Sequence, residues 1–318
     1  MEATQREKNI YGNGVEIVSR EEDCTVYRLT DKNGGDIVMT CYKVFPGIEL
    51  VYNDVHMQEC HIEPVSFGNV IQIDHCREGR IECEFSDEYI YLTAGDLSIA
   101  YKNDVGHGSY FPLSHYHGVS IYIDIDEAPK CLSCFLVDVN VSPEALAQKF
   151  CSDNKGFVVR SNEHIDHVFS ELYDVHDSIK KGYFKVKILE LMLFLLGFDV
   201  KNKSEERFVS RAQVSLAKCV RRYLTDNMDK KLTLEQLSSQ FHISGTQIKD
   251  AFKAVYGVSL YAFIRTQKME SAAQMLITTD KSVLEIAGLY GYDNGSKFAS
   301  AFKTVIGMTP NEYRNHNL

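Results

Sequence analysis

A segment in the C-terminal third of this 318-residue chain occurs twice, with the second copy 50 residues after the first. The matched pairs are Phe252 and Phe302, Lys253 and Lys303, Gly257 and Gly307, and Leu234 and Leu284. This period lies at the upper edge of the range for structural repeats, and two copies are too few for a solenoid. The repeat therefore predicts one helical unit used twice, whose role depends on what its exposed helix faces can bind.

Each copy is predicted to contain two helices joined by a tight turn. The first copy predicts helices over 234–241 and 245–256, and the second predicts helices over 283–290 and 295–306. A Ser or Thr stands before each of the first three helices as an N-cap, and a glycine follows the second helix of each copy. This spacing is typical of a helix-turn-helix.

A long helix is predicted between the copies, over 259–277, with Ile264, Met269, Ala272 and Leu276 along its inner side. At 1.5 Å per residue, its 19 residues span about 28 Å. One turn of B-DNA is about 34 Å long, so a rod of this length could hold two recognition helices in successive major grooves. The geometry favours a DNA-binding module over an unspecialised helical bundle.

Charge is divided unevenly along the chain. Residues 207–318 contain 15 Lys and Arg and 9 Asp and Glu, a net charge of +6, whereas the residues upstream carry −16. Lys and Arg bind phosphate by releasing counterions, so a basic module on an acidic chain is what a nucleic-acid contact requires. A solvated basic surface without a partner is the alternative.

Residues 211–314 resemble the AraC/XylS family of bacterial transcription regulators, whose DNA-binding domain has two helix-turn-helix units joined by a long helix. The resemblance is carried by Leu234-x-x-Leu237, Ile248-x-x-x-Phe252-Lys253-x-x-x-Gly257, Ile264-Arg265-x-x-Lys268-Met269, Val283-x-x-Ile286-Ala287, Gly291-Tyr292-x-x-x-Ser296-x-Phe298, Phe302-Lys303-x-x-x-Gly307-Met308-Thr309-Pro310 and Tyr313-Arg314. It implies an all-α domain that binds double-stranded DNA.

By this resemblance, the second helix of each unit would contact DNA. The base-facing positions would be Thr246, Lys249 and Asp250 in the first unit and Gly295, Ser296, Lys297 and Ser300 in the second, and Lys253 and Lys303 would contact phosphate. Lys249 can pair with guanine and Thr246 can meet a thymine methyl group. Asp250 departs from the family's frequent basic or amide residue, and an acid there either accepts from cytosine or repels phosphate. The small residues of the second unit predict that the first unit discriminates between base sequences and that the second unit mainly positions the domain on the DNA.

Residues 1–140 are predicted to form β-structure of the barrel or jelly-roll type. Short runs of β-forming residues, separated by turn residues, lie over 70–76, 80–85, 89–92, 96–101 and 119–125. In the last run, Val119, Ile121, Ile123 and Ile125 alternate with more polar residues, so one face of the strand is apolar. The resemblance implies a cupin-like barrel that binds a small effector.

Helices are predicted after residue 140. Ser142 and Pro143 begin a helix that runs to Phe150, residues 162–179 have the spacing of an amphipathic helix, and residues 184–198 are apolar almost all round. The last two are predicted to form a hairpin that packs on the barrel or on a second subunit.

The chain is therefore predicted to be an α+β multidomain protein. A cupin-like regulatory barrel covers 1–140, a helical dimerisation region covers 141–198, a polar linker covers 199–208, and the DNA-binding domain covers 209–318.

A small-molecule pocket is predicted inside the barrel, with a mostly apolar lining and a few polar groups. Its expected lining is Ile73, His75, Cys83, Phe85, Ile99, Tyr101, His115, His117, Ile121 and Ile123, with Arg77 and Arg80 at the rim to hold an anionic effector. The alternative is that these side chains fill the barrel and that the two arginines are solvated.

Metal and thiol chemistry are two further possibilities for the same domain. His115-x-His117 lacks the spacing of a metal-binding cupin, because positions 121 and 122 are Ile and Tyr and Gly108 stands seven residues before His115. Neither a metal site nor a catalytic residue is predicted. Nine cysteines, an odd number, in a chain whose N-terminus does not resemble a signal peptide indicate reduced thiols. Cys76, Cys83 and the pair Cys131 and Cys134 are candidates for a thiol sensor.

The predicted function is sequence-specific DNA binding by a ligand-responsive transcription regulator. Its expected partners are double-stranded DNA, a small-molecule effector, a second copy of the chain in a homodimer, and RNA polymerase, without a cofactor. A thiol sensor with the same output and a metal-dependent cupin enzyme are the alternatives, and activation and repression are both left open. No run of about 18 apolar residues is present, so a cytoplasmic protein without membrane contact is expected.

Overall fold

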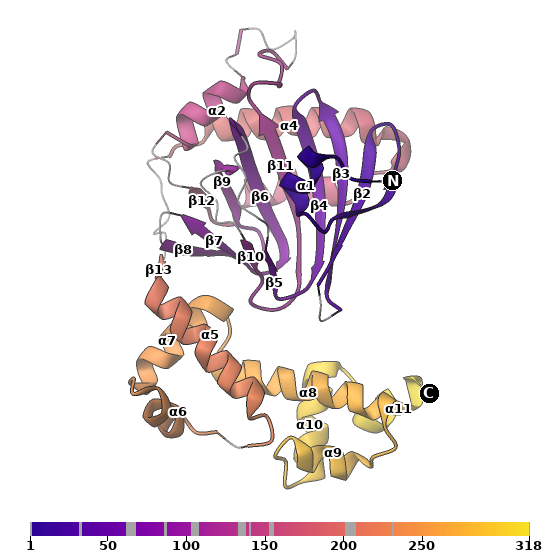
Figure 1. Ribbon diagram of the computed structural model, residues 1–318, viewed down its shortest axis with the longest axis vertical. Helices are drawn as coiled ribbons and strands as arrows, with labels where there is room; N and C mark the ends of the chain where they lie inside the picture. Colours follow the sequence, from indigo (N-terminus) through magenta and orange to yellow (C-terminus); the bar gives the residue numbers. More distant parts are fainter. Residues whose placement is uncertain are drawn as a thin grey trace. The chain divides into compact units, whose positions relative to one another are not determined.

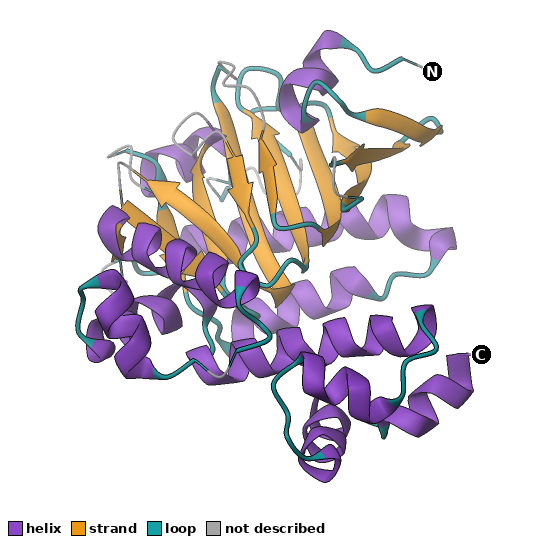
Figure 2. Ribbon diagram, turned by 60° about the horizontal axis from the view of Figure 1, so that its bottom comes forward, coloured by secondary structure: helices purple, strands orange, loops and turns teal. Residues whose placement is uncertain are grey.

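A computed structural model describes residues 2–31, 34–61, 68–85, 88–102, 108–132, 138–139, 141–152, 156–200, 208–230 and 232–317. The chain divides into two compact units, Met1–Phe208 and Val209–Leu318. The first unit carries two β-sheets with covering helices, and the second is almost entirely helical (Figure 2).

Eight strands form the larger sheet of the first unit, in the order β1-β2-β3-β4-β11-β6-β9-β12 (Figure 1). They are β1 (Glu16–Arg20), β2 (Cys24–Thr30), β3 (Asp36–Phe45), β4 (Ile48–His56), β6 (Val70–Gly79), β9 (Leu97–Tyr101), β11 (Tyr116–Asp124) and β12 (Phe157–Val159). All neighbouring pairs are antiparallel. As a result, β11 lies between β4 and β6 although it is distant from both in sequence.

The smaller sheet contains β8 (Glu88–Leu92), β7 (Ile81–Phe85), β10 (Gly108–Tyr110) and β5 (Glu59–His61), in this order. Among the described strands both sheets are open, since the outer strands of the larger one, β1 and β12, do not pair with each other. The predicted β-domain is therefore confirmed as β-rich, but its described strands form two open sheets and do not close into a barrel. The strand runs themselves are confirmed, with ends shifted by at most three residues. Alternation reports which face of a strand is buried and not which strands pair at the edges, so it cannot establish closure.

Three helices, α2 (Pro143–Phe150), α3 (Glu163–Ser170) and α4 (Lys180–Gly197), pack on one face of the larger sheet (Figure 1). The prediction of a single helix over 162–179 is wrong. The observed helix α3 ends at Ser170, and two short 3-10 segments follow it, η3 (Glu171–Tyr173) and η4 (Asp177–Ile179). Asp174, with φ −128° and ψ 65°, leaves the helical region between them. The apolar spacing continues across this break because Leu172 still faces the core, which is why periodicity alone concealed it.

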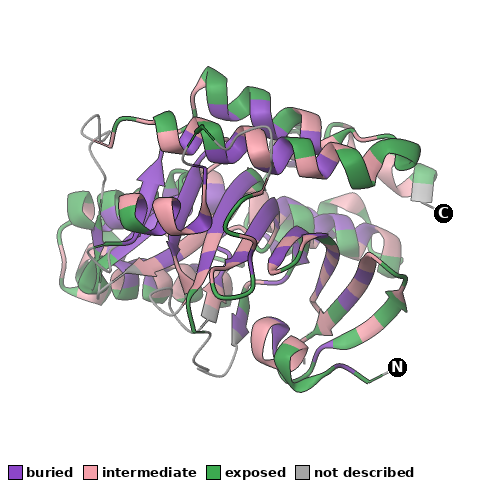
Figure 3. Ribbon diagram, turned by 90° about the horizontal axis from the view of Figure 1, so that it is seen from above, coloured by how far each residue is buried: buried purple, intermediate pink, exposed green. Residues whose placement is uncertain are grey.

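An apolar core lies on each face of the larger sheet, and Figure 3 shows buried residues along its strands. Leu50, Ile121 and Phe169 belong to the core between this sheet and the helices. Val51 and Ile90 belong to the core between the two sheets. Successive residues of a strand point to opposite faces, which is why the neighbours Leu50 and Val51 are buried in different cores.

The second unit contains the duplicated helices. After a short strand β13 (Val209–Ser210), its helices are α5 (Arg211–Asp226), α6 (Leu234–Phe241), α7 (Gly245–Tyr256), α8 (Leu260–Thr278), α9 (Val283–Leu289), α10 (Gly295–Ile306) and α11 (Pro310–Asn317). The pairs α6–α7 and α9–α10 are the two copies, and α8 connects them (Figure 1). The predicted pair of helix-turn-helix units with a long linking helix is confirmed.

Candidate functional site

The helix α7 presents a polar, exposed side. Ser244 caps the helix by accepting a hydrogen bond from the backbone N–H of Gln247, whose side chain accepts one from the backbone of Ser244. The exposed side chains that follow include Thr246, Lys249, Asp250 and Lys253. Residues three or four positions apart lie on the same side of a helix. The four residues predicted to contact DNA in the first unit therefore share one surface.

The opposite side of α7 is anchored in the core. Ile248 and Phe252 are fully buried. The ring centroid of Phe252 lies 4.4 Å from that of Tyr256 and 5.3 Å from that of Phe263 on α8. These contacts fix the rotation of α7 about its axis and thereby keep Lys249 on the outer side.

The helix α10 has the same design with smaller outer side chains. The side chain of Asn294 caps it by accepting from the backbone N–H groups of Ser296 and Lys297 at 2.8 and 3.3 Å. Phe298 and Phe302 are fully buried. Its exposed side chains include Ser296, Lys297, Ser300 and Lys303.

Gly295 differs from the other predicted contact positions. It is only partly exposed, and a Cβ added there would lie 3.6 Å from the Leu284 side chain of α9. At the equivalent Gly245 of the first unit, an added Cβ would lie only 2.7 Å from Leu234 of α6. The glycine side of each helix thus faces the preceding helix, an arrangement that the 50-residue offset linking these residues could have revealed.

Two basic residues from the motifs of the resemblance support the linking helix. The Lys268 Nζ donates to the carbonyl oxygens of Tyr290 at 2.8 Å and Lys230 at 3.3 Å, and burial lowers the pKa of Lys268 against the opposing effect of Asp229. The Arg314 Nε donates to the carbonyl oxygen of Leu276 at 3.0 Å, near the end of α8. Sequence reasoning missed this role, because nothing in a motif tells a structural cation from one that binds phosphate.

The residues predicted to line an effector pocket are placed on different sides of the larger sheet. Ile73, Ile99, Ile121 and Ile123 are buried in the core beneath the helices, and Tyr101 packs at its edge. Cys83 belongs to the core between the sheets, and the side chain of Phe85 lies outside the described residues. Strand alternation groups residues by face but does not tell which face is covered by helices.

The two arginines expected at the rim of that pocket, and the histidines expected in its lining, also lie in separate places. Arg77 and Arg80 lie over the rings of Tyr173 and Tyr91, at 4.4 and 5.0 Å from the centroids. His75 is buried and stacked on Phe169 at 4.0 Å between centroids. Burial lowers its pKa to about 4, which keeps it neutral.

The pair His115 and His117 does not converge on one point. The His115 Nδ1 lies 3.2 Å from the carbonyl oxygen of Leu113. The His117 Nδ1 lies 3.1 Å from the carboxylate of Asp54 on the neighbouring strand β4. The histidine pair suggested by the sequence is thus divided between two environments.

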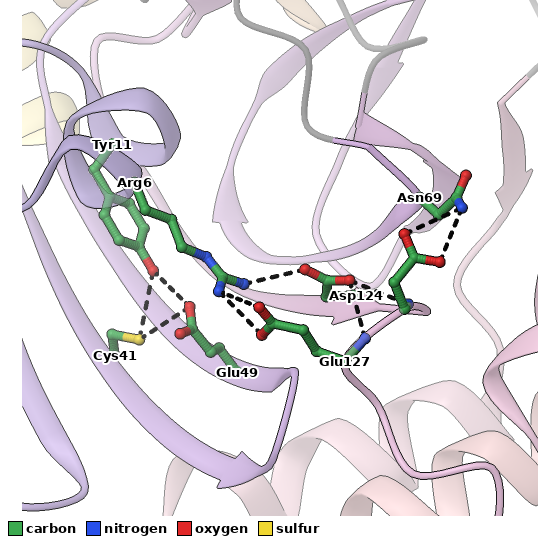
Figure 4. A network of polar contacts seen from close by, with 8 residues as sticks. Arg6, Tyr11, Cys41, Glu49, Asn69, Asp124 and Glu127 are labelled. Carbon is green, nitrogen blue, oxygen red and sulfur yellow. Dashed lines mark hydrogen bonds and ion pairs between the residues drawn. The ribbon is translucent and has the colours of Figure 1, made fainter.

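A cavity of about 260 Å³ lies between α1 (Gln5–Tyr11) and the larger sheet. Its lining residues are Arg6, Asn9, Ile10, Gly47, Glu49, Val70, Lys102, Tyr122 and Asp124. Figure 4 shows that α1 is tied to the sheet, because Arg6 pairs with Glu127 at 2.8 Å and with Asp124 at 3.2 Å, and Tyr11 donates to Glu49 at 3.2 Å. Of these lining residues none belongs to the predicted pocket. The sequence held no indication of the cavity, because α1 is separated by a long stretch of chain from the strands it covers.

A buried polar network extends from this cavity into the sheet. Lys102 donates to Gln72 at 3.1 Å, Gln72 donates to Asp74 at 2.7 Å, and Ser120 donates to Asp74 at 2.6 Å. Burial lowers the pKa of Lys102 to about 8, although Asp74 opposes this shift. Burial also raises the pKa of Asp74, against the hydrogen bonds from Ser120 and Gln72. Because buried polar groups are costly unless paired, this network is a specific feature of the interior.

Two of the thiols proposed as sensors, Cys76 and Cys83, lie in an environment that does not activate them. Cys76 and Cys83 are buried. Burial raises the pKa of Cys76 to about 12 and raises that of Cys83 as well. Reactive thiols have lowered pKa values, so this environment disfavours oxidation at both residues. Cys131 is exposed, and Cys134 lies outside the described residues.

Within the described part of the chain, no helix is both long and apolar enough to cross a lipid bilayer.

Comparison with known proteins matches the second unit. The model of a family described as a helix-turn-helix domain matches residues 237–316. The transposon Tn10 TetD protein of Escherichia coli is 32% identical over 96 residues, which cover 30% of this chain and 70% of that protein. The HTH-type transcriptional regulator YdiP of Escherichia coli (strain K12) is 32% identical over 123 residues, covering 39% of this chain and 40% of that protein.

A solved structure, the C-terminal domain of AraT, a response regulator from Geobacillus stearothermophilus, is 30% identical. It covers 32% of this chain and 84% of that chain, with a TM-score of 0.31. The chain spans only about two fifths of the length of YdiP, so the similarity concerns the helix-turn-helix region. Through this C-terminal region, the chain belongs to the AraC/XylS family of transcription regulators.

Proposed function

We propose that the chain is a transcription regulator that binds double-stranded DNA in a sequence-specific way. The observation that carries this proposal is the pair of helix-turn-helix units, each with one helix anchored by buried aromatic residues and polar on its outer side. The net charge of +6 over 207–318 supports contact with phosphate.

The two units have different proposed roles. Thr246, Lys249 and Asp250 of α7 read base edges, and Lys253 contacts phosphate. Ser296, Lys297, Ser300 and Lys303 of α10 hold the domain on the duplex, with Gly295 allowing α10 to pack on α9. The 19 residues of α8 span about 28 Å, which suits two helices in successive major grooves.

A homodimer is the proposed assembly, through the helical region over 141–198. The support is α4, whose outward-facing Val186 and Leu193 are 60% and 38% exposed. Exposed apolar side chains on one side of a helix are a common feature of protein interfaces.

DNA binding and dimerisation are tested together by sequencing the genomic fragments that the purified full chain retains. We expect enrichment of one motif, present twice per fragment, because a symmetric dimer binds paired half-sites. Fragments without a shared motif would contradict sequence-specific binding. A motif that occurs once per fragment would contradict the dimer.

A small polar effector is proposed to bind in the cavity beside α1. The cavity combines apolar walls with groups of both charges, Lys102 and Arg6 against Glu49 and Asp124, as ligand sites with a few orienting polar groups do. An effector bound there would contact both α1 and the larger sheet, so it would change the stability of the packing of α1 on the sheet.

The effector site is tested by screening small polar molecules for an increase in the melting temperature of the full chain. A ligand at one hundred times its Kd stabilises the folded state by about 2.7 kcal/mol. We expect this increase to be lost in Lys102→Met and kept in Lys130→Met, whose lysine is exposed and lies outside the cavity. An equal increase in both variants would place the ligand elsewhere.

A further inference from the structure

Two histidines and an aspartate meet near the ends of two adjacent central strands of the larger sheet. Asp54 and His56 belong to β4, and His117 belongs to the adjacent β11. Their ligand atoms, one from each residue, all lie within 4.8 Å of one another. The Asp54 Oδ1 lies 2.9 Å from the His56 Nε2 and 3.1 Å from the His117 Nδ1.

The backbone brings these side chains together by strand register. Asp54 and His56 are two positions apart, so they point to the same face of β4. His117 is the register partner of Asp54, and directly opposed residues of an antiparallel pair have Cβ atoms about 5 Å apart. The cluster therefore depends on the two central strands and not on a loop.

We propose that Asp54, His56 and His117 bind a divalent transition-metal ion, with zinc as the reference ion. Imidazole nitrogen and carboxylate oxygen are zinc ligands, with metal–ligand distances of about 2.0–2.2 Å, which correspond to ligand–ligand separations of about 3.3 Å in a tetrahedron. The spacings of 2.9 and 3.1 Å are close to this value. Side-chain rotation alone can make the adjustment, because the side chains of Asp54, His56 and His117 are 52%, 57% and 34% exposed.

The surroundings of the cluster favour a cation. Glu78 on β6 is the register partner of His117 and is exposed, and Asp36 on β3 is the register partner of His56. Arg28 offsets part of this charge through its ion pair with Asp36 at 2.9 Å. Three protein ligands leave a fourth position for water, as in zinc sites whose coordination is open.

The site differs from a cupin-type metal site, which would use His115 and His117 together. His115 is instead turned toward Leu113. It also differs from the cavity beside α1, because none of the three ligands lines that cavity. Binding here would link β4 to β11 and is independent of the proposed effector.

The test is a zinc titration of the chelator-treated, reduced full chain against a chromophoric competitor. We expect one equivalent of zinc in addition to any held by cysteines, and a loss of affinity of at least about tenfold in His117→Ala and His56→Ala. Asp54→Asn keeps the shape of the side chain and should weaken binding in the same direction. His167→Ala removes an exposed histidine of α3 and should bind as the unchanged protein does.

Two further measurements keep the result interpretable. Melting temperatures without metal establish that each variant is folded, and only the unchanged protein and His167→Ala should gain stability on adding zinc. Cobalt spectra without the near-ultraviolet bands of thiolate ligation are expected for this site. Equal zinc affinity in the unchanged protein and in all three ligand variants would overturn the proposal, as would the absence of any bound zinc.

Discussion

Replacing Phe252 by alanine is expected to lower the free energy of unfolding of the second unit by about 3–5 kcal/mol. The side chain is fully buried, and its ring packs against those of Tyr256 and Phe263. Truncation removes these contacts and leaves a cavity that the surrounding helices cannot fill completely. Urea unfolding of the full chain, followed by the circular dichroism of its helices, measures the effect.

The duplicated position and an exposed residue provide the controls. Phe302→Ala should lower the free energy of unfolding by a similar amount, because Phe302 is also fully buried. Its ring centroid lies 5.8 Å from that of Phe298 and 5.7 Å from that of Tyr313. Leu289→Ala, at a side chain that is 45% exposed in α9, should change stability by less than about 0.5 kcal/mol. A cost below about 1 kcal/mol for both phenylalanines would show that they do not anchor the two helices.

Replacing Lys249 by alanine is expected to weaken binding to a cognate DNA site by about 1–3 kcal/mol more than binding to random DNA. Lys249 is exposed on the outer side of α7, where its ammonium group can reach the acceptor atoms of guanine in the major groove. Equilibrium binding to the selected site and to a scrambled site, at one fixed salt concentration, measures the difference.

Variants of other lysines separate base reading from general attraction. Lys253→Ala and Lys303→Ala should weaken binding to both DNAs and lower the salt dependence by about one unit of slope each. Lys281→Ala removes an exposed charge between α8 and α9 and should have little effect on the preference. Equal losses on the two DNAs for Lys249→Ala would contradict a base-reading role.

The C-terminal unit could be predicted almost completely from local patterns. Capping residues such as Ser244 and Asn294 determine where α7 and α10 begin, and the glycines that follow these helices determine where they end. Each of these signals acts on residues only a few positions away. Buried phenylalanines 50 residues apart identify the two copies. The structural roles of Lys268 and Arg314 could not be predicted, because each donates to a carbonyl oxygen more than twenty residues away.

The N-terminal unit could be predicted only in its local elements, which are the strands after residue 70 and the helices α2 and α4. Turn residues mark the ends of the runs that form β6 and β9, and alternation marks β11, but the order of the strands in the sheet and its open edges depend on pairing between distant segments. The apolar residues expected to line a pocket instead pack beneath α3 and α4. The cavity beside α1 depends on the docking of the N-terminal helix, for which no local pattern exists.

The sequence by itself determined the helices of the second unit, the duplicated units they form, the family and the side chains on the outer surfaces of α7 and α10. These features depend on caps, periodicity and spacing within about 50 residues, which are local properties of the chain. Only the tertiary structure decided that the sheets are open, that Asp54 and His56 meet His117, and that Lys102 faces a cavity under α1. The reason is physical: antiparallel pairing and helix docking bring together residues whose separation in sequence carries no information about their separation in space.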